Sequence, residues 1–291
     1  MINKIPLLED FILFKQTVGL KSKTIDEYVD SISKFAGWIA EYTEKSHLTR
    51  YSYKTITESD AQTYLFKLRE TLSINSTKKY LAGVSQFFKW LKKNGYIDQN
   101  PFHSVEMQKN KEHVTREYMT YEESQLLINS IDNDYEKLMM MLMSVQTYRI
   151  NEVCNILVEN INLESNTINA LRKNSKWQEL KIRKELREMV TDRVAYCKER
   201  GHKYLFQSPI RETGIDTNTV RTIFIKWRDA VGLNSDYSPH DLRRVACFDL
   251  YYNLKLELFK VSKIMNHSSV RTTEIYLKID QRAINDELED L

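Results

Sequence analysis

The chain has 291 residues, which at roughly 150 residues per domain predicts about two domains. Hydrophobic residues make up 42% of it and charged residues 29%, so it can build packed cores and lacks the composition of a disordered chain. Only 7 glycines and 4 prolines are present, which favours helices over sandwiches and propellers. Neither glycine-rich nucleotide motif, GxGxxG or GxxxxGK followed by Ser or Thr, occurs, and no cofactor is expected.

The three cysteines, Cys154, Cys197 and Cys247, lie far apart and form no CxxC pair. This spacing argues against a disulfide framework and a zinc knuckle, so we expect no metal and a reducing, cytoplasmic setting. The amino terminus lacks a continuous apolar core, and no uncharged run of 18 residues follows, so no membrane partner is expected.

Apolar residues recur at helical spacing in the first third of the chain, for example Ile25, Ile32 and Ile39. We predict four helices here and a helical domain over residues 1–107. Residues 108–115 are strongly polar without apolar periodicity, which is typical of an interdomain linker.

Residues 116–291 mix two patterns and are predicted to form a second domain. Residues 121–157 show helical spacing, residues 161–163, 167–171 and 179–182 are typical of short strands, and helical spacing returns from residue 185 onward. The expected fold class is therefore mainly α with one small antiparallel β-sheet, in two domains.

The net charge is only +3, but basic residues are unevenly placed. Residues 75–94 contain five lysines and no acid, and residues 168–187 contain seven basic residues against two acidic ones. Such runs are usually solvated faces, yet they also suit contacts with phosphates.

The segment Ser238-Pro-His-Asp-Leu-Arg-Arg244 has the features of a helix start, because Ser is a preferred cap and Pro is favoured at the first helical position. His240 and Arg243 then share one face of the first turn, where free backbone amides favour an anion. Taken alone, a surface His and Arg pair is the commoner explanation.

Other candidate residues are unremarkable one by one. Arg149 precedes Glu152 by one helical turn, which is typical of a simple ion pair. Lys173 and Lys176 lie in a polar turn between two predicted strands. His267 and Tyr276 lie nine residues apart, and in a chain with 17 tyrosines any one of them usually serves packing.

In chain order, however, these residues resemble the constellation of tyrosine site-specific recombinases of the phage-integrase and Xer type. The set is Arg149, Lys173, His240, Arg243, His267 and Tyr276. The family segment Thr-Gly-Leu-Arg-x-x-Glu is matched by residues 146–152, Gly-Lys-Gly-x-Lys by residues 172–176, and Leu-Gly-His-x-x-x-x-Thr-Thr-x-x-Tyr by residues ending at Tyr276. The departures fall at glycines, which are replaced by Thr147, Arg172, Asn174 and Asn266.

The resemblance covers nearly the whole chain and implies a helical, SAM-like core-binding domain followed by a catalytic domain. It also implies that Tyr276 attacks a DNA phosphodiester to give a 3′-phosphotyrosyl link and that His240 accepts its proton. Arg149, Arg243 and His267 would then hold the phosphoryl oxygens. Lys173, chosen over Lys176, would protonate the leaving 5′ oxygen, and Glu152 would orient the site.

Two helices are expected to grip DNA from opposite faces, so that the domains close as a clamp. One begins after Asp216 and the other after Asn75. The predicted contact residues are Ser76, Thr77, Lys78, Lys79, Thr219, Arg221, Thr222 and Lys226. The family resemblance implies a homotetramer on double-stranded DNA with paired inverted sites, exchange of Arg282–Leu291 between neighbours, and a role for accessory proteins.

The biological task stays open between several uses of one chemistry. Helical patterning that starts by Pro6 leaves no room for an additional arm-binding domain, which slightly favours a Xer-like or transposon cointegrate resolvase role over a mobile-element or phage integrase. Two weaker alternatives are a cleavage-deficient DNA-binding protein on the same scaffold and a helical protein-interaction module.

Overall fold

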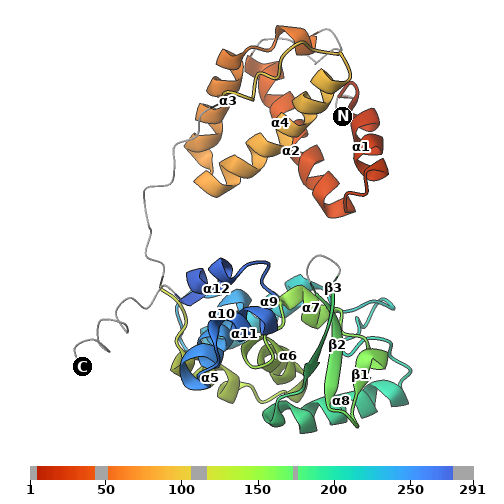
Figure 1. Ribbon diagram of the computed structural model, residues 1–291, viewed down its shortest axis with the longest axis vertical. Coiled ribbons are helices and arrows are strands. Elements are labelled where there is room, and N and C mark those ends of the chain that lie inside the picture. Colours follow the sequence, from red (N-terminus) through yellow and green to blue (C-terminus); the bar gives the residue numbers. More distant parts are fainter. Residues whose placement is uncertain (1–4, 43–51, 106–116, 173–175, 278–291) are drawn as a thin grey trace, which may run out of the picture. The chain divides into compact units, whose positions relative to one another are not determined.

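A computed structural model describes residues 5–42, 52–105, 117–172 and 176–277 (Figure 1). The chain divides into two compact units, residues 1–115 and 116–291. The predicted linker, residues 108–115, lies outside the described residues.

The amino-terminal unit is built from α-helices and one short 3₁₀ turn. These are α1 (Leu8–Thr17), α2 (Ser22–Tyr42), η1 (Ser52–Thr55), α3 (Glu58–Thr71) and α4 (Ile74–Lys93). Side chains define two of the starts: the Thr57 hydroxyl accepts from the Asp60 amide ahead of α3, and the Ser73 hydroxyl accepts from the Ser76 amide ahead of α4. The four helices that the apolar spacing predicts are therefore present.

Helices α2 and α4 pack closely at the centre of this unit. The approach is close at Gly83 of α4, where an added Cβ atom would lie 2.5 Å from the Ser31 Cβ atom of α2. Around it, Phe35, Phe87 and Phe88 are almost completely buried and meet in edge-to-face ring contacts. The glycine lets two aromatic-rich helices approach without a gap.

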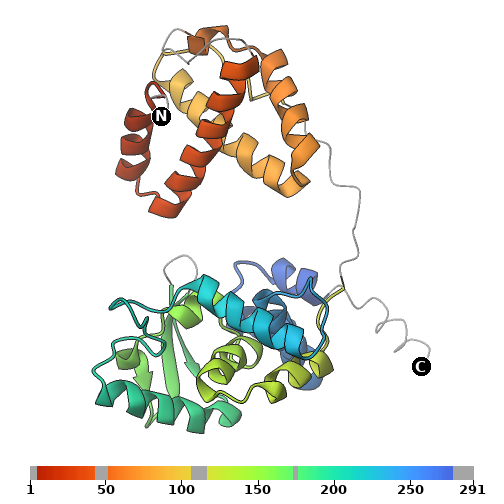
Figure 2. The ribbon, with the colours of Figure 1, turned by 180° about the vertical axis from the view of Figure 1, so that it is seen from behind.

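The carboxyl-terminal unit contains most of the elements. Its helices are α5 (Tyr121–Ser130), α6 (Asp134–Ser144), α7 (Ile150–Cys154), α8 (Arg187–Glu199), α9 (Thr217–Ala230), α10 (Pro239–Phe248), α11 (Leu258–Ile264) and α12 (Val270–Leu277), with 3₁₀ turns η2 (Val158–Asn160) and η4 (Lys184–Leu186). Helix α10 continues as a π-helical turn, η5 (Asp249–Asn253). Figure 2 shows α9, in cyan, lying in front of α6 in the view from behind.

A three-stranded antiparallel sheet completes this unit, in the order β1 (Ile161–Asn162), β2 (Thr167–Arg172), β3 (Lys176–Lys181). The sheet confirms the predicted fold class, but the predicted strand limits were wrong. Pairing between β2 and β3 extends to Arg172 opposite Lys176, so both strands reach further into the polar segment 171–177 than predicted. The polarity of the side chains does not mark the ends of these strands, because the hydrogen bonds that pair the strands join backbone groups.

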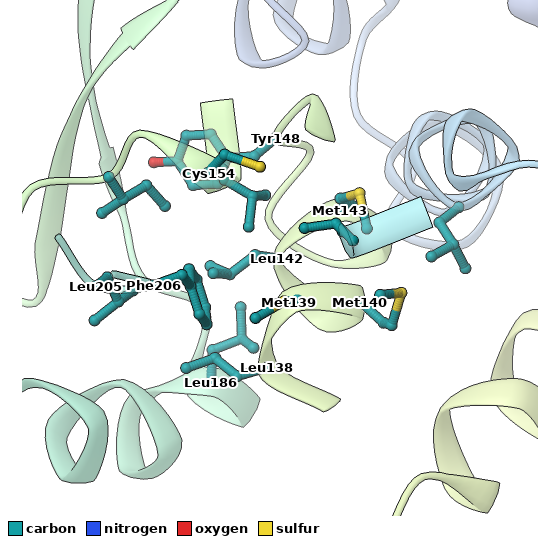
Figure 3. Packing of buried hydrophobic residues seen from close by; sticks show 14 of the residues in the cluster. Leu138, Met139, Met140, Leu142, Met143, Tyr148, Cys154, Leu186, Leu205 and Phe206 are labelled. Carbon is teal, nitrogen blue, oxygen red and sulfur yellow. The ribbon is translucent and has the colours of Figure 1, made fainter. Parts of the chain in front are cut away.

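Helix α6 forms the centre of the carboxyl-terminal core (Figure 3). Leu138, Met139 and Leu142 on this helix are 0–1% exposed and pack with Leu205 and Phe206 from the segment after α8. The packed core holds α6 and β2, and Arg149 follows the first of these elements while Arg172 ends the second. Within the described residues, no helix is both long and apolar enough to cross a membrane.

Two glycines in helices of the amino-terminal unit should respond in opposite ways to alanine. Gly37→Ala meets nothing within 4 Å and should raise the free energy of unfolding by about 0.5–1 kcal/mol, because alanine favours the helix. Gly83→Ala should lower it by about 1–2 kcal/mol, because the overlap with Ser31 outweighs the same helical gain. Chemical denaturation of the two variants measures both effects, and equal stabilisation by both would contradict the close approach.

Candidate active site

Arg149 and Glu152 lie at the start of α7, where the chain leaves the core helix α6. The backbone amide of Arg149 donates to Glu152 Oε2 at 2.8 Å, and its Nη1 donates to Oε1 at 2.8 Å. The Glu152 side chain is 4% exposed and the Arg149 side chain 23%. The carboxylate thus holds its partner from behind while the guanidinium group keeps an open side.

The segment 238–244 forms the predicted helix start. Ser238 caps α10, its amide donating to the buried Asp241 carboxylate at 2.8 Å. His240 is exposed on the first turn, and Arg243, one turn later, is 1% exposed. The sequence pattern correctly predicted the cap, the proline position and the shared face.

The carboxyl end of α11 brings the arginines together. The last carbonyl groups of a helix have no partner inside it, and here side chains from other elements donate to them. Arg149 Nη2 donates to the Asn266 carbonyl at 3.3 Å, and Arg243 Nη2 donates to the Met265 carbonyl. Arg243 Nη1 also lies 4.0 Å from Glu152 Oε2. The guanidinium groups of Arg149 and Arg243, 94 positions apart in the sequence, therefore meet at the carboxyl end of α11.

His267 and Tyr276 complete this cluster of side chains. The Tyr276 hydroxyl is hydrogen-bonded to His240 Nε2, and the Tyr276 ring centroid lies 4.9 Å from that of His267. His267 Nδ1 is bonded to the Thr273 hydroxyl at 2.8 Å, which fixes the ring between α11 and α12. The tyrosine thus occupies the site of its own chain.

The local charges set the protonation states of these groups. Burial, with Arg243 and Arg149 nearby, lowers the pKa of His267 to about 4. His240 is exposed as a residue, but partial desolvation of its ring beside Tyr276, and then the charge of Arg243, lower its pKa. Burial raises the pKa of Tyr276 despite the neighbouring arginines. Burial and Arg149 lower the pKa of Arg243 to about 9, which leaves it charged at pH 7. At neutral pH the site holds neutral imidazoles, a protonated phenol and charged guanidinium groups.

Several buried nitrogen atoms of this site have no hydrogen-bond partner among the described residues. They are Nε and Nη1 of Arg172, Nε and Nη1 of Arg243, and Nε2 of His267. Buried polar atoms are normally satisfied, and a cationic donor set without acceptors suits an oxyanion. The described residues contain no group of three or more His, Cys, Asp or Glu side chains that could hold a metal ion.

The backbone keeps a glycine-like conformation at two of the replaced positions. Thr147 has a φ angle of 67° and Asn266 of 47°, both in the left-handed region. Asn tolerates this region, whereas a β-branched Thr adopts it only when its surroundings demand it. The turns before Arg149 and His267 therefore hold their shape without glycine.

Two arginines of the site were missed as functional residues. Arg172 lies at the end of β2 with its side chain fully buried, 3.2 Å from Glu152 Oε2. Arg244 Nη2 donates to the Tyr276 carbonyl at 2.7 Å, and its guanidinium carbon lies 3.6 Å from the Tyr118 ring centroid. Strand alternation with Ile168 and Ala170, both buried, would have predicted an inward Arg172.

Of the two lysines that the sequence offers for proton transfer, Lys173 lies outside the described residues. Lys176 begins β3 and is exposed.

The predicted DNA-contact residues lie mostly at the surface of their helices. Thr219, Arg221, Thr222 and Lys226 of α9 are exposed, as are Lys78 and Lys79 of α4, whereas Ser76 is half-buried. Thr77 is wrong as a contact residue, because it is 0% exposed and belongs to the inner face of α4. Its spacing to Leu81 and Val84 is the helical signature of that face.

Known proteins match both units. A model of the phage integrase family matches residues 117–282, and a model of the phage integrase N-terminal SAM-like domain matches residues 7–98. A tyrosine recombinase of Pseudothermotoga lettingae is 24% identical over 264 residues, 89% of this chain and 88% of the relative. Tyrosine recombinase XerA of Pyrococcus horikoshii is 24% identical over 290 residues, 97% of this chain and 92% of the relative.

Solved structures share the fold. A lambda integrase dimer bound to a COC′ core site matches with a TM-score of 0.72 at 20% identity, over 94% of this chain and 76% of that one. The Tn1549 transposon integrase in complex with transposon right end DNA matches with a TM-score of 0.71 at 15% identity, over 93% of each chain. With one family model spanning more than half of its length, the chain belongs to the phage integrase family, the tyrosine site-specific recombinases, which cleave and rejoin DNA.

Proposed function

We propose that this recombinase cleaves DNA through a 3′-phosphotyrosyl intermediate with Tyr276 as the nucleophile. The observation that carries the proposal is the hydrogen bond between the Tyr276 hydroxyl and His240 Nε2 beside unpartnered arginine donors. A nucleophile in contact with a base, next to a cationic oxyanion site, has the parts that phosphoryl transfer to a side chain requires.

The first step is loss of the phenolic proton as the oxygen attacks phosphorus. Burial raises the pKa of Tyr276, so the phenol needs an acceptor. His240 has a lowered pKa and is neutral at pH 7, so its Nε2 can take the proton in the transition state. The P–O bond to the 5′ oxygen then breaks, and the enzyme is left joined to the 3′ phosphate.

Charge builds up on the non-bridging oxygens during this step. The planar donor forks of Arg149 and Arg243 suit two such oxygens, and Arg243 has two buried donors ready for them. His267 adds a donor at Nε2 if the Thr273 hydroxyl donates to Nδ1. Glu152 fixes Arg149 without touching the phosphate.

The departing 5′ oxygen requires a proton, and Lys173 is the proposed donor by its place in the family motif. Because the phosphotyrosyl link keeps the energy of the broken phosphodiester, an incoming 5′ hydroxyl can reseal the strand without ATP. That agrees with the missing nucleotide motifs.

The proposed partner is double-stranded DNA with paired inverted sites, bound by a homotetramer with accessory proteins. A lambda integrase tetramer bound to a Holliday junction shares the fold, with a TM-score of 0.69. We propose that α4 and α9 grip the duplex and that the two units close around it. The proposed exchange segment, Arg282–Leu291, lies outside the described residues.

For the biological role we propose a Xer-like or cointegrate resolvase activity, with integration as the second candidate. Support comes from the XerA relative, which matches over 97% of this chain. Sequencing the DNA covalently trapped on the purified protein separates the two roles. A chromosomal or cointegrate recombination site supports the first, and the ends of a mobile element support the second.

Tyr276→Phe should abolish covalent capture of DNA while leaving DNA binding intact, because only the nucleophilic oxygen is removed. A nicked suicide duplex incubated with wild type should give a covalent protein–DNA band on denaturing gels. Mobility shifts without an adduct from wild type would favour a cleavage-deficient DNA-binding protein. Absence of both would favour a protein-interaction module.

The acid limb of strand cleavage should lie below pH 6.5, because the pKa of His240 is lowered from that usual value. As pH falls through this pKa, His240 gains a proton and can no longer accept one, so the rate falls. Single-turnover cleavage at sub-saturating DNA, measured across pH 5 to 8, checks this. His240→Gln should cleave slowly without this limb, and a limb centred above pH 6.5 would contradict the assignment.

Replacing Lys78 and Lys79 by Gln should reduce the slope of log affinity against log salt concentration by about two, because each lysine–phosphate contact releases about one counterion. Fluorescence anisotropy at several salt concentrations measures the slope. Lys198→Gln is the control, since this lysine is exposed and belongs to α8, a helix that lies on the opposite side of its unit from α12 (Figure 1). An unchanged slope in the double variant would refute the role of α4.

A further inference from the structure

Arg172 is the feature of the site that the family motif does not contain. The motif places a glycine here, and glycine has no side chain to enter the site. In this chain the side chain is 0% exposed and therefore cannot reach DNA. A buried guanidinium group is costly unless it is paired, so its partners indicate its role.

Each partner of Arg172 is a neighbour of Arg149. Arg172 Nη1 lies 3.2 Å from Glu152 Oε2, whose other oxygen accepts from Arg149. Arg172 Nη2 donates to the Ile264 carbonyl at 3.0 Å, two residues before the carbonyl that accepts from Arg149. Its guanidinium carbon lies 4.6 Å from the ring centroid of Tyr148, the residue that precedes Arg149.

The cluster of Arg149, Arg172, Arg243 and Glu152 carries a net positive charge. The Glu152 carboxylate faces Arg149, Arg172 and Arg243, so three positive charges meet one negative charge and leave +2. A phosphodiester carries about one negative charge, and its pentavalent transition state about two. Without Arg172, the carboxylate would neutralise more of the charge that the other two arginines present to the phosphate.

We propose that Arg172 is a positioning residue for Arg149: it holds Glu152 and the end of α11 from behind, so that the Arg149 fork stays aimed at the scissile phosphate and the cluster matches the charge of the transition state. This inference rests on the proposed cleavage function. It predicts an effect on the chemical step rather than on DNA affinity.

The test compares Arg172→Met with Arg172→Lys on two suicide duplexes, one with a normal scissile phosphate and one with a neutral methylphosphonate. Arg172→Met should bind DNA within about threefold of wild type and cleave the phosphate about 100-fold more slowly, because Arg149 is misplaced. On the methylphosphonate, whose transition state carries one negative charge fewer, Arg172→Met should cleave only a few-fold more slowly than wild type. Arg172→Lys should restore part of the rate.

Arg193→Met is the matched control, since Arg193 also donates to a backbone carbonyl and stacks on tyrosines, but on α8. Any loss of cleavage rate in Arg193→Met should be equal on the two substrates and should parallel the fall in its melting temperature. The positioning role is overturned if folded Arg172→Met cleaves the phosphate at the wild-type rate, or loses equally on both substrates.

A readout independent of cleavage separates this inference from the proposed function. In ¹⁵N spectra of the free protein, the Arg149 guanidinium should show hindered rotation in wild type and faster rotation in Arg172→Met. If wild type forms no adduct, the cleavage mechanism fails, yet the rotation still reports on Arg172. Unchanged rotation in the variant would overturn the positioning role by itself.

Discussion

The active site depends on the end of one short helix. Three successive carbonyl groups, from Ile264 to Asn266, accept no backbone amide of the described residues where α11 stops, and arginine side chains from β2, α10 and the start of α7 donate to them. Since these donors include Arg149, Arg172 and Arg243, the backbone of α11 serves as the common support of the cationic groups. Their relative placement therefore follows from helix termination rather than from direct contacts between like charges.

This arrangement explains how so many positive charges coexist in a small buried volume. Glu152 supplies one opposing charge, and the carbonyl oxygens supply partial ones. Desolvation, and then the field of the arginines, lowers the pKa of His240 and His267 and keeps both neutral, since an added proton would bring another positive charge beside the guanidinium groups. A base and two or more permanent cations can thus work side by side at neutral pH.

Much of this architecture could be predicted from the sequence, because local rules dominate it. The cap at Ser238, the helix after Asp216 and the two-part chain follow from capping and apolar spacing. The inward positions of Arg172 and Thr77 also follow local periodicity, that of strand β2 and that of the inner face of α4. What the sequence could not predict is the pairing of Arg172 with Glu152, 20 positions earlier, because it depends on long-range packing.

The unpartnered donors of Arg243 and His267 have a cost for the fold as a whole. Buried polar atoms without a hydrogen-bond partner among the described residues lower the stability of the fold relative to apolar side chains of equal volume. Selection for a more stable protein would therefore tend to replace these reactive side chains. We expect homologues that have lost the reaction to carry aliphatic residues at the positions of Arg243 and His267. Stability and reactivity therefore place opposite demands on Arg243 and His267.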